Sequence, residues 1–254
     1  MAKKNICFMA FAYPWFFGPY GNQILKLSKK FLDIGYEVSF LGLAEALPKK
    51  TYSYKELMNN DSDIKLKLDS ETKITLSKIT FLGGITKMSE EILISSINEV
   101  VEHFNISTLI ALMDLRNLVE DTTLKCKSLI WYPNHFNPPT NYTLSKLRVF
   151  SHIISLCETD CELLKNYLPD KNVEYIPHII EFDEPKDSIN LLRKKYGVPE
   201  NAFVVLINCG NYELQNRKSL DTSIFGFEEF SNKYDNVFLY IHAYNIKNLN
   251  NKNN

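Results

Sequence analysis

The chain has 254 residues, of which 45% are hydrophobic and 23% charged, an ordinary globular composition with enough length for two domains of common size. Its formal net charge of −1 excludes a global field that would draw it to nucleic acid or anionic lipid, so any basic site must be local. It contains no run of about 18 apolar residues, which excludes a membrane span on length and leaves only peripheral membrane contact open.

The five cysteines are odd in number and scattered, and four of them lie in or beside apolar runs: Cys7, Cys126, Cys157, Cys161 and Cys209. This usage indicates buried thiols in a reducing compartment, so we expect a cytoplasmic protein. Cys157 and Cys161 lie one helical turn apart but lack two further soft ligands nearby, so we expect no zinc site. The apolar run after Lys3-Lys4 is interrupted at Pro14, which favours a buried first strand over a signal peptide.

Short apolar runs rich in β-branched and aromatic residues alternate with amphipathic stretches of helical length, which is typical of βαβ units and a parallel sheet. We expect strands at residues 6–11, 37–41, 64–68, 79–82, 108–113, 128–131, 152–156 and 173–176. We expect helices at residues 23–34, 88–104, 115–124 and 158–167. Gly35 stands where the first helix needs a C-terminal cap, and the polar stretch 44–63 is interpreted as an insertion or mobile loop.

Prolines restrict the backbone of the loop at residues 177–185, and we place a domain boundary there. The predicted parts are a Rossmann-like domain at 1–176, a second, partial Rossmann-like domain at 177–244, and an asparagine-rich tail at 245–254 that we expect to be disordered. In the second domain we expect helix 188–196, strand 203–207, helix 220–230 and strand 237–242. Because so small a sheet exposes much of its apolar face, we expect this domain to be incomplete.

A basic pair, Arg217 and Lys218, stands between the strand at 203–207 and the helix at 220–230. In a doubly wound sheet, ligands bind beyond the carboxyl ends of strands, where helix N-termini offer N–H donors and a positive dipole end. The pair is therefore placed to hold phosphate. The alternative interpretation is the solvated start of a helix.

Two further segments follow strands at the same predicted edge. Gly18-Pro-Tyr-Gly21-Asn22-Gln23 lies between the first strand and the first helix, where glycines permit a close approach of backbone to ligand; the alternative is a turn with Asn22 as N-cap. His135 lies in a Pro/Asn loop after the strand at 128–131. There it is a candidate for a polar functional role, and the alternative is a structural histidine. Asp114 and Glu158 also lie at strand-to-helix junctions, and for both a helix-cap role is the favoured interpretation.

Three segments together resemble GT-B glycosyltransferases of the family 4 type. The glycine segment with Leu27, Leu32 and Gly35-Tyr-Glu-Val38 is similar to the opening of that family. Ser151 to Glu158 with Val173 to His178 is similar to its interdomain passage, and residues 191–206 followed by Asn216-Arg217-Lys218 are similar to its second-domain entry. The order and spacing agree over nearly the whole chain.

The resemblance implies an α/β fold with two Rossmann-like domains, the first binding an acceptor and the second a nucleotide sugar. It implies that Arg217 and Lys218 neutralise the donor diphosphate, that His135 lies near the transferred sugar, and that Gly18, Gly21 and Asn22 approach donor or acceptor. Fixed cations would stabilise the departing diphosphate, so no metal or other cofactor is needed, and no Asp-x-Asp is present. Retention of anomeric configuration would follow from the family.

The chain departs from the family in two places. Ile179 stands where the family commonly has glycine after the Pro-His pair, so positive φ would be costly there. The family's Glu-x7-Glu element, which binds donor sugar and ribose, does not occur in the 36 residues (254 − 218) that follow Lys218. We therefore expect weak nucleotide-sugar binding and slow turnover from the chain as given.

Three hypotheses follow from the sequence. The first is a glycosyltransferase, or the N-terminal part of one, of hexosyltransferase type, with an unknown glycan, lipid or protein acceptor. The second is a non-catalytic module derived from the GT-B fold that binds a glycan or a partner chain. The third, a sugar-nucleotide epimerase, lacks a further acid/base pair at useful positions.

Overall fold

The computed structural model describes residues 5–15, 18–43, 46–59, 68–85, 91–119, 122–180, 184–210 and 218–244. The chain divides into two compact units, Met1–Ile180 and Glu181–Asn254. The domain boundary predicted after Ile176 lies four residues before this division (180 − 176), in the loop that follows the last strand of the first unit.

The first unit alternates strands and helices in chain order. Its elements are β1 (Asn5–Ala10), α1 (Pro19–Asp33), β2 (Glu37–Gly42), β3 (Thr51–Tyr52), α2 (Tyr54–Asn59), α3 (Ser70–Ser77), β4 (Thr80–Leu82), β5 (Ile92–Leu93), α4 (Ile94–His103), β6 (Thr108–Leu112), the 3-10 turn η1 (Leu115–Asn117), β7 (Leu118–Val119), β8 (Lys127–Tyr132), α5 (Asn141–Leu147), β9 (His152–Ser155), α6 (Glu158–Tyr167) and β10 (Asn172–Tyr175).

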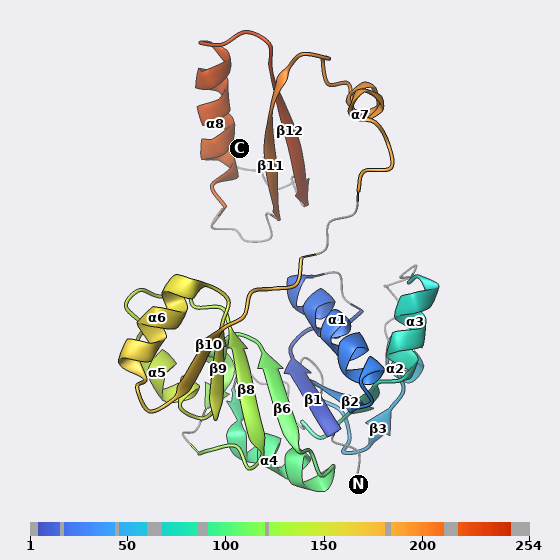
Figure 1. The fold of residues 1–254 in the computed structure, drawn as a ribbon, viewed down its shortest axis with the longest axis vertical. Helices are drawn as coiled ribbons and strands as arrows, with labels where there is room; N and C mark the ends of the chain where they lie inside the picture. The colour runs from blue at the N-terminus through green and yellow to red at the C-terminus, as the bar shows by residue number, and fades with distance from the viewer. Residues whose placement is uncertain are drawn as a thin grey trace, which may run out of the picture. The chain divides into compact units, whose positions relative to one another are not determined.

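Eight of these strands form one sheet in the order β10-β9-β8-β6-β1-β2-β4-β3. All neighbours are parallel except the edge pair β3 and β4, and Cys7 of β1 is in register with Ser39 of β2 and Leu109 of β6. The chain therefore leaves β1 to one side through β2 and β4, and returns to its other side as β6 (Figure 1). The carboxyl ends of β1 and β6 thus form the topological switch point, where doubly wound sheets bind ligands.

Alternate residues of the central strand enter two separate cores, one on each face of the sheet. Phe8 packs with α1, α2 and α3, whereas Cys7 and Met9 pack with α4, α5 and α6. Helices thus cover both faces, which is the doubly wound architecture that the alternation of strands and helices predicts. Figure 1 shows α1 and α3 side by side over the first of these faces.

The first helix ends as the sequence predicts but begins earlier. Gly35 has φ +87°, its N–H bonds Leu32 O, and the N–H of Tyr36 bonds Phe31 O, which together form a Schellman cap. At the other end, Pro19 occupies the first turn, where its fixed φ suits a helix and its missing N–H costs nothing. The helix therefore starts four residues before the predicted Gln23 (23 − 19).

Three other predictions about the first unit need correction. The stretch 44–63, interpreted as an insertion or mobile loop, contains β3 and α2 in its described part. The helix predicted at 115–124 is a single 3-10 turn followed by β7, because Leu118 pairs with Ile92 of β5. The helix predicted at 88–104 begins only at Ile94, after β5. The strand predicted at 64–68 lies largely outside the described residues.

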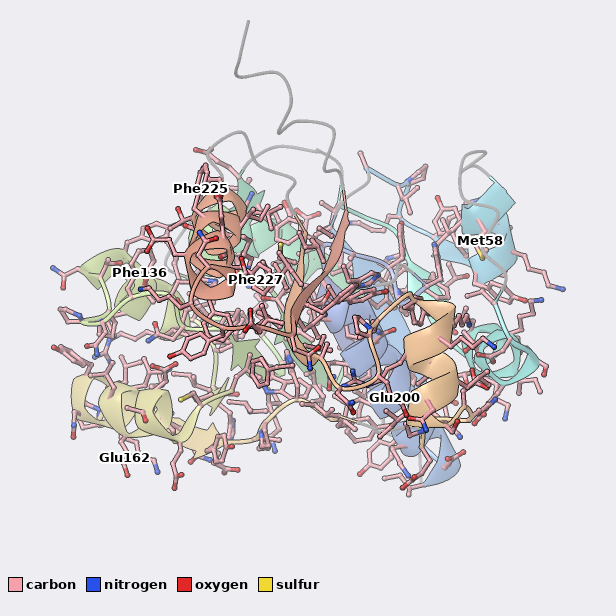
Figure 2. All side chains as sticks on the ribbon, turned by 90° about the horizontal axis from the view of Figure 1, so that it is seen from above. Met58, Phe136, Glu162, Glu200, Phe225 and Phe227 are labelled. Carbon is pink, nitrogen blue, oxygen red and sulfur yellow. The ribbon has the colours of Figure 1, made fainter. Side chains whose placement is uncertain are left out.

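The second unit contains α7 (Ile189–Lys195), β11 (Phe203–Gly210), α8 (Leu220–Ser231) and β12 (Val237–Tyr244). β11 and β12 are parallel and α8 connects them, so the predicted helices and strands and the βαβ unit are confirmed. Among its described hydrophobic residues only Ala202 and Leu220 are buried, whereas Phe203 is 64% exposed and Phe225 is 65% exposed. Figure 2 labels Phe225, which belongs to α8. The predicted tail at 245–254 lies outside the described residues. In the described parts of both units, no helix has the length and apolar character needed to cross a membrane.

Candidate functional site

Two polar residues meet where neighbouring parallel strands end in the first unit. Asp114 follows the carboxyl end of β6, and His135 follows the carboxyl end of β8, the next strand in the sheet. His135 Nε2 lies 2.9 Å from Asp114 Oδ1, and the two side chains are 54% and 35% exposed. The pair therefore stands at the sheet edge beside the switch point and is accessible to solvent.

The contact determines which hydrogen bonds His135 can make. In a neutral imidazole one ring nitrogen donates and the other accepts. With Nε2–H donating to the Asp114 carboxylate, Nδ1 remains as an acceptor for a hydroxyl group. The structure gives Asp114 the backbone position of an N-cap of η1 but no capping hydrogen bond, so its side chain holds His135 instead of the helix end. Glu158 is the first residue of α6, after the N-cap Cys157.

The loop that carries His135 is fixed by its neighbour Asn134. The Asn134 amide donates to Phe136 O at 3.0 Å and to Asp160 Oδ1, from α6, at 3.1 Å. Because these bonds join the loop to itself and to a helix, the imidazole is held on an ordered support. Phe136, in the same loop, is exposed (Figure 2).

Burial and the negative charge of Asp114 both raise the pKa of two phenol groups. Burial raises the pKa of Tyr20, in the first turn of α1, to about 12, and the negative charge of Asp114 and the phenol of Tyr132 add to the effect. Burial also raises the pKa of Tyr132; a hydrogen bond with Thr143 opposes the rise, and Asp114 and Asp160 add to it. Both phenols stay protonated at neutral pH, so they can donate hydrogen bonds near the carboxylate.

A segment after β10 crosses this edge and is bound to two elements of the unit. Trp131 Nε1 donates to Ile176 O at 2.8 Å. Gln23, only 6% exposed, donates from Nε2 to Ile179 O at 2.8 Å and accepts from Ile179 N at 2.7 Å. We call Ile176–Ile179 with these three bonds the strap. It brings the first turns of α1 against the end of the first unit, 156 residues further along the chain.

His178 lies within the strap between two aromatic rings. Its ring is 5.0 Å from that of Trp131 and 6.4 Å from that of Tyr20, edge-on in both cases. Its Nε2 is buried without a hydrogen-bond partner, and burial lowers its pKa. Ile179 is not among the described residues with positive φ, and both its backbone groups are paired with Gln23, so the strap needs no glycine there.

The structure corrects the predicted glycine loop. Gly18 is the N-cap of α1 with extended backbone, at φ −149°, and a Cβ there would meet nothing within 4 Å. Gly21 is buried inside the first turns of α1, and Asn22 is an exposed residue of the same helix whose N–H bonds Gly18 O, so Asn22 is not the N-cap. Pro19 explains the difference, because it starts the helix before both residues.

The predicted phosphate pair is described only in part. Arg217 lies outside the described residues, whereas Lys218 is exposed in the second unit, two residues before α8 begins at Leu220. Ser219, the N-cap of α8, has φ 48° and ψ 44° and makes no capping bond. That Lys218 faces His135 and Gly18 across a cleft stays a prediction, as do the assigned roles.

The described residues contain no group of three or more His, Cys, Asp or Glu side chains that could hold a metal ion. The five cysteines are free thiols; Cys7 and Cys161 are buried and Cys157 is exposed. Burial raises the pKa of the Cys7 thiol to about 12, with Cys126 adding to the rise, and a hydrogen bond involving Ser39 opposes it.

The α/β architecture, with a large parallel sheet in the first unit and a βαβ unit in the second, is that of GT-B type glycosyltransferases. A glycosyltransferase from Rickettsia africae ESF-5 superposes with a TM-score of 0.50 at 11% identity, over 98% of this chain and 71% of that one. WaaG, a glycosyltransferase involved in lipopolysaccharide biosynthesis, gives a TM-score of 0.46 at 11% identity, over 96% of this chain and 72% of that one.

At 11% identity, what this chain shares with the Rickettsia enzyme is the fold. No family model matches the sequence, and no curated protein matches it.

Proposed function

We propose that this protein is a glycosyltransferase that moves a sugar from a nucleoside-diphosphate donor to an acceptor hydroxyl. The observation that carries the proposal is the His135–Asp114 pair at the carboxyl edge of the sheet, where Asp114 follows β6, one of the two switch-point strands, and His135 follows its neighbour β8. The fold of the chain is shared with a solved glycosyltransferase, and this similarity supports sugar transfer as the proposed reaction.

On the donor side, we assign Arg217 and Lys218 to the diphosphate. Departure of a nucleoside diphosphate builds negative charge on its oxygens, and fixed cations stabilise that charge. Lys218 lies just before the 12-residue helix α8, whose N-terminus adds free N–H groups and a positive dipole end. These groups would stabilise the leaving diphosphate without a metal ion or other cofactor.

On the side of the transferred sugar, we assign His135. Its Nδ1 would accept a hydrogen bond from a sugar hydroxyl while Nε2–H donates to Asp114. Asp114 then acts as the positioning residue that fixes the ring and its tautomer. The same proposal includes transfer with retention of the anomeric configuration and a cytoplasmic location. It also includes a glycan, a lipid or a protein as the acceptor.

Isothermal titration of UDP, GDP and ADP and of their sugar derivatives against the purified chain tests the donor assignment. We expect one nucleotide to bind, with weak affinity, and Lys218→Ala to lower that affinity. Lys233→Ala, which removes an exposed lysine beyond the end of α8, is the matched control. Equal affinities of the wild type and K218A would contradict the donor assignment.

The alternative is a non-catalytic module that binds a glycan or a partner chain. The specific observation in its favour is that the donor-side unit has a two-stranded described sheet with exposed Phe203, Leu206 and Phe225. A chain that binds free glycans but none of the nucleotides in the titration would favour this alternative over a transferase.

A further inference from the structure

A cavity of about 180 Å³ lies between α1 and α3 in the first unit. Asn22 and Leu25 of α1 form one wall, and Asp69 and Thr72, at the start of α3, form the other. Pro14, Trp15 and Leu68 complete its lining. Its volume is well below the roughly 300 Å³ at which pockets for drug-sized ligands begin, so it suits one small ring.

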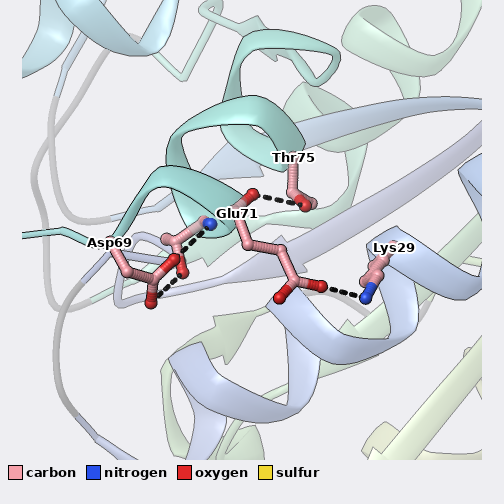
Figure 3. A network of polar contacts seen from close by, with 5 residues as sticks. Lys29, Asp69, Glu71 and Thr75 are labelled. Atoms are coloured by element: carbon pink, nitrogen blue, oxygen red, sulfur yellow. Dashed lines mark hydrogen bonds and ion pairs between the residues drawn. The ribbon is translucent and has the colours of Figure 1, made fainter.

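The two walls of the cavity contact each other and are joined by a surface ion pair. Lys29 of α1 forms an ion pair with Glu71 of α3, as Figure 3 shows. Trp15, which is part of the lining, stacks on Tyr13 with ring centroids 4.5 Å apart and planes within 3° of each other. Trp15 also contacts Phe81 of β4, with centroids 5.2 Å apart. Trp15 is therefore an ordered wall of the cavity, and a ligand would lose little entropy in organising it.

The polar groups of the cavity favour a neutral ligand with hydroxyls. Asp69 accepts from Thr72 N at 2.7 Å and from the Thr72 hydroxyl at 3.1 Å, and the first of these bonds lowers its pKa (Figure 3). An ionised carboxylate repels phosphates and carboxylates, yet its two oxygens retain acceptor capacity for ligand hydroxyls. The exposed Asn22 amide can both donate and accept.

The apolar part of the lining completes the match to a pyranose. Pro14, Leu25 and Leu68 offer C–H surface, and a sugar ring presents C–H groups on its faces and hydroxyls around its rim. A small apolar pocket with a few convergent polar groups is the usual form of a ligand site.

The position of the cavity separates it from the proposed reaction centre. Trp15 packs over β4, whereas His135 follows β8, four strand spacings away in the order β8-β6-β1-β2-β4. At about 4.8 Å a spacing, these strands lie roughly 19 Å apart. The cavity and His135 therefore lie over different strands of the sheet, and we assign them to different sugar units of one ligand.

We propose that the cavity binds one neutral pyranose of a glycan acceptor, a sugar unit other than the one that reacts. The acceptor role rests on the proposed glycosyltransferase function, whereas sugar binding by the cavity does not. The inferred acceptor is an oligosaccharide, one sugar of which reaches the reaction centre while another occupies the cavity.

Saturation-transfer NMR titration with methyl glycosides of glucose, galactose, mannose and N-acetylglucosamine tests binding on the full chain. We expect at least one to bind, and Asn22→Ala to raise its Kd about fivefold, the loss typical of one neutral hydrogen bond. Leu25→Phe, which fills the cavity from α1, is expected to abolish binding. Asn166→Ala, an exposed asparagine on α6, is the matched control.

Three results would overturn the proposal: no binding of any glycoside, unchanged binding in N22A, or stronger binding of glucose 6-phosphate than of the neutral glycosides. In a transfer assay, N22A is expected to raise the KM for a disaccharide acceptor, and the control N166A is expected to leave it unchanged. Sugar binding sensitive to N22A without any transfer would refute the proposed function and leave the sugar site standing. Transfer with an unchanged acceptor KM would refute the acceptor role of the cavity alone.

Discussion

Replacing Gln23 by methionine is expected to destabilise the first unit by releasing the strap. Gln23 is buried and makes two hydrogen bonds, of 2.7 and 2.8 Å, with the backbone of Ile179. Methionine keeps the volume of the side chain but makes neither bond. At about 0.5–1.5 kcal/mol for each bond, the expected loss in the free energy of unfolding is about 1–3 kcal/mol.

Urea denaturation followed by tryptophan fluorescence measures this loss. The chain has two tryptophans, Trp15 and Trp131, and both belong to the first unit, so the signal reports that unit. With a slope of about 2 kcal/mol per molar urea, a loss of about 2 kcal/mol lowers the midpoint by about 1 M. Lys30→Met, at an exposed position of the same helix, is the control. A Q23M midpoint equal to that of K30M would refute the role given to the strap.

Four further predictions concern single groups. Spectrophotometric titration should find one phenol that ionises near pH 12 and that is absent from the Tyr20→Phe variant. The Asp114→Asn variant should lower the pKa of this phenol. An unchanged pKa would show that the Asp114 carboxylate lies too far from Tyr20 to affect it. Because folding raises the pKa of Tyr20 from 10, its contribution to stability is complete below pH 10 and is lost as pH rises toward 12, so Y20F should flatten alkaline denaturation; equal curves would contradict this. D114N should also lower the transfer rate by up to about 100-fold with donor Kd unchanged, because His135 loses its fixed orientation; an unchanged rate would contradict the positioning role. Ellman's reagent should label Cys157 in the native chain and Cys7 only after denaturation, and the reverse order would contradict the burial of Cys7 between the sheet and α4, α5 and α6.

The sequence carries enough local signal to predict the doubly wound architecture of the first unit. The helix Glu158–Tyr167 is predicted with both ends correct, and Gly35 is recognised as a cap, because both depend on residues within one or two turns. The helix predicted at 115–124 is wrong because Leu115, Leu118 and Val119 have the i, i+3, i+4 spacing of a helix. Pairing of Leu118 with Ile92 overrides that spacing, and no local pattern reports it.

The candidate site was predictable residue by residue but not as an assembly. His135 and Asp114 can each be placed at a strand end from the sequence, yet their contact requires β6 and β8 to be neighbours, which depends on strand order. The role of Gln23 is even harder to predict from the sequence, because its partner Ile179 is 156 residues away and forms the hydrogen bonds through its backbone. The start of α1 was missed because the glycines near Pro19 outweighed its preference for a first helical turn.

The most direct test of the central claim is the release of nucleoside diphosphate from nucleotide sugars in the presence of glycan acceptors. The assay compares the wild type with His135→Ala and uses Asn166→Ala as the control. We expect slow release by the wild type and N166A, dependent on acceptor, and at least tenfold slower release by H135A with the donor Kd unchanged. Release by H135A at the wild-type rate, or no acceptor-dependent release by the wild type, would contradict a glycosyltransferase site built around His135.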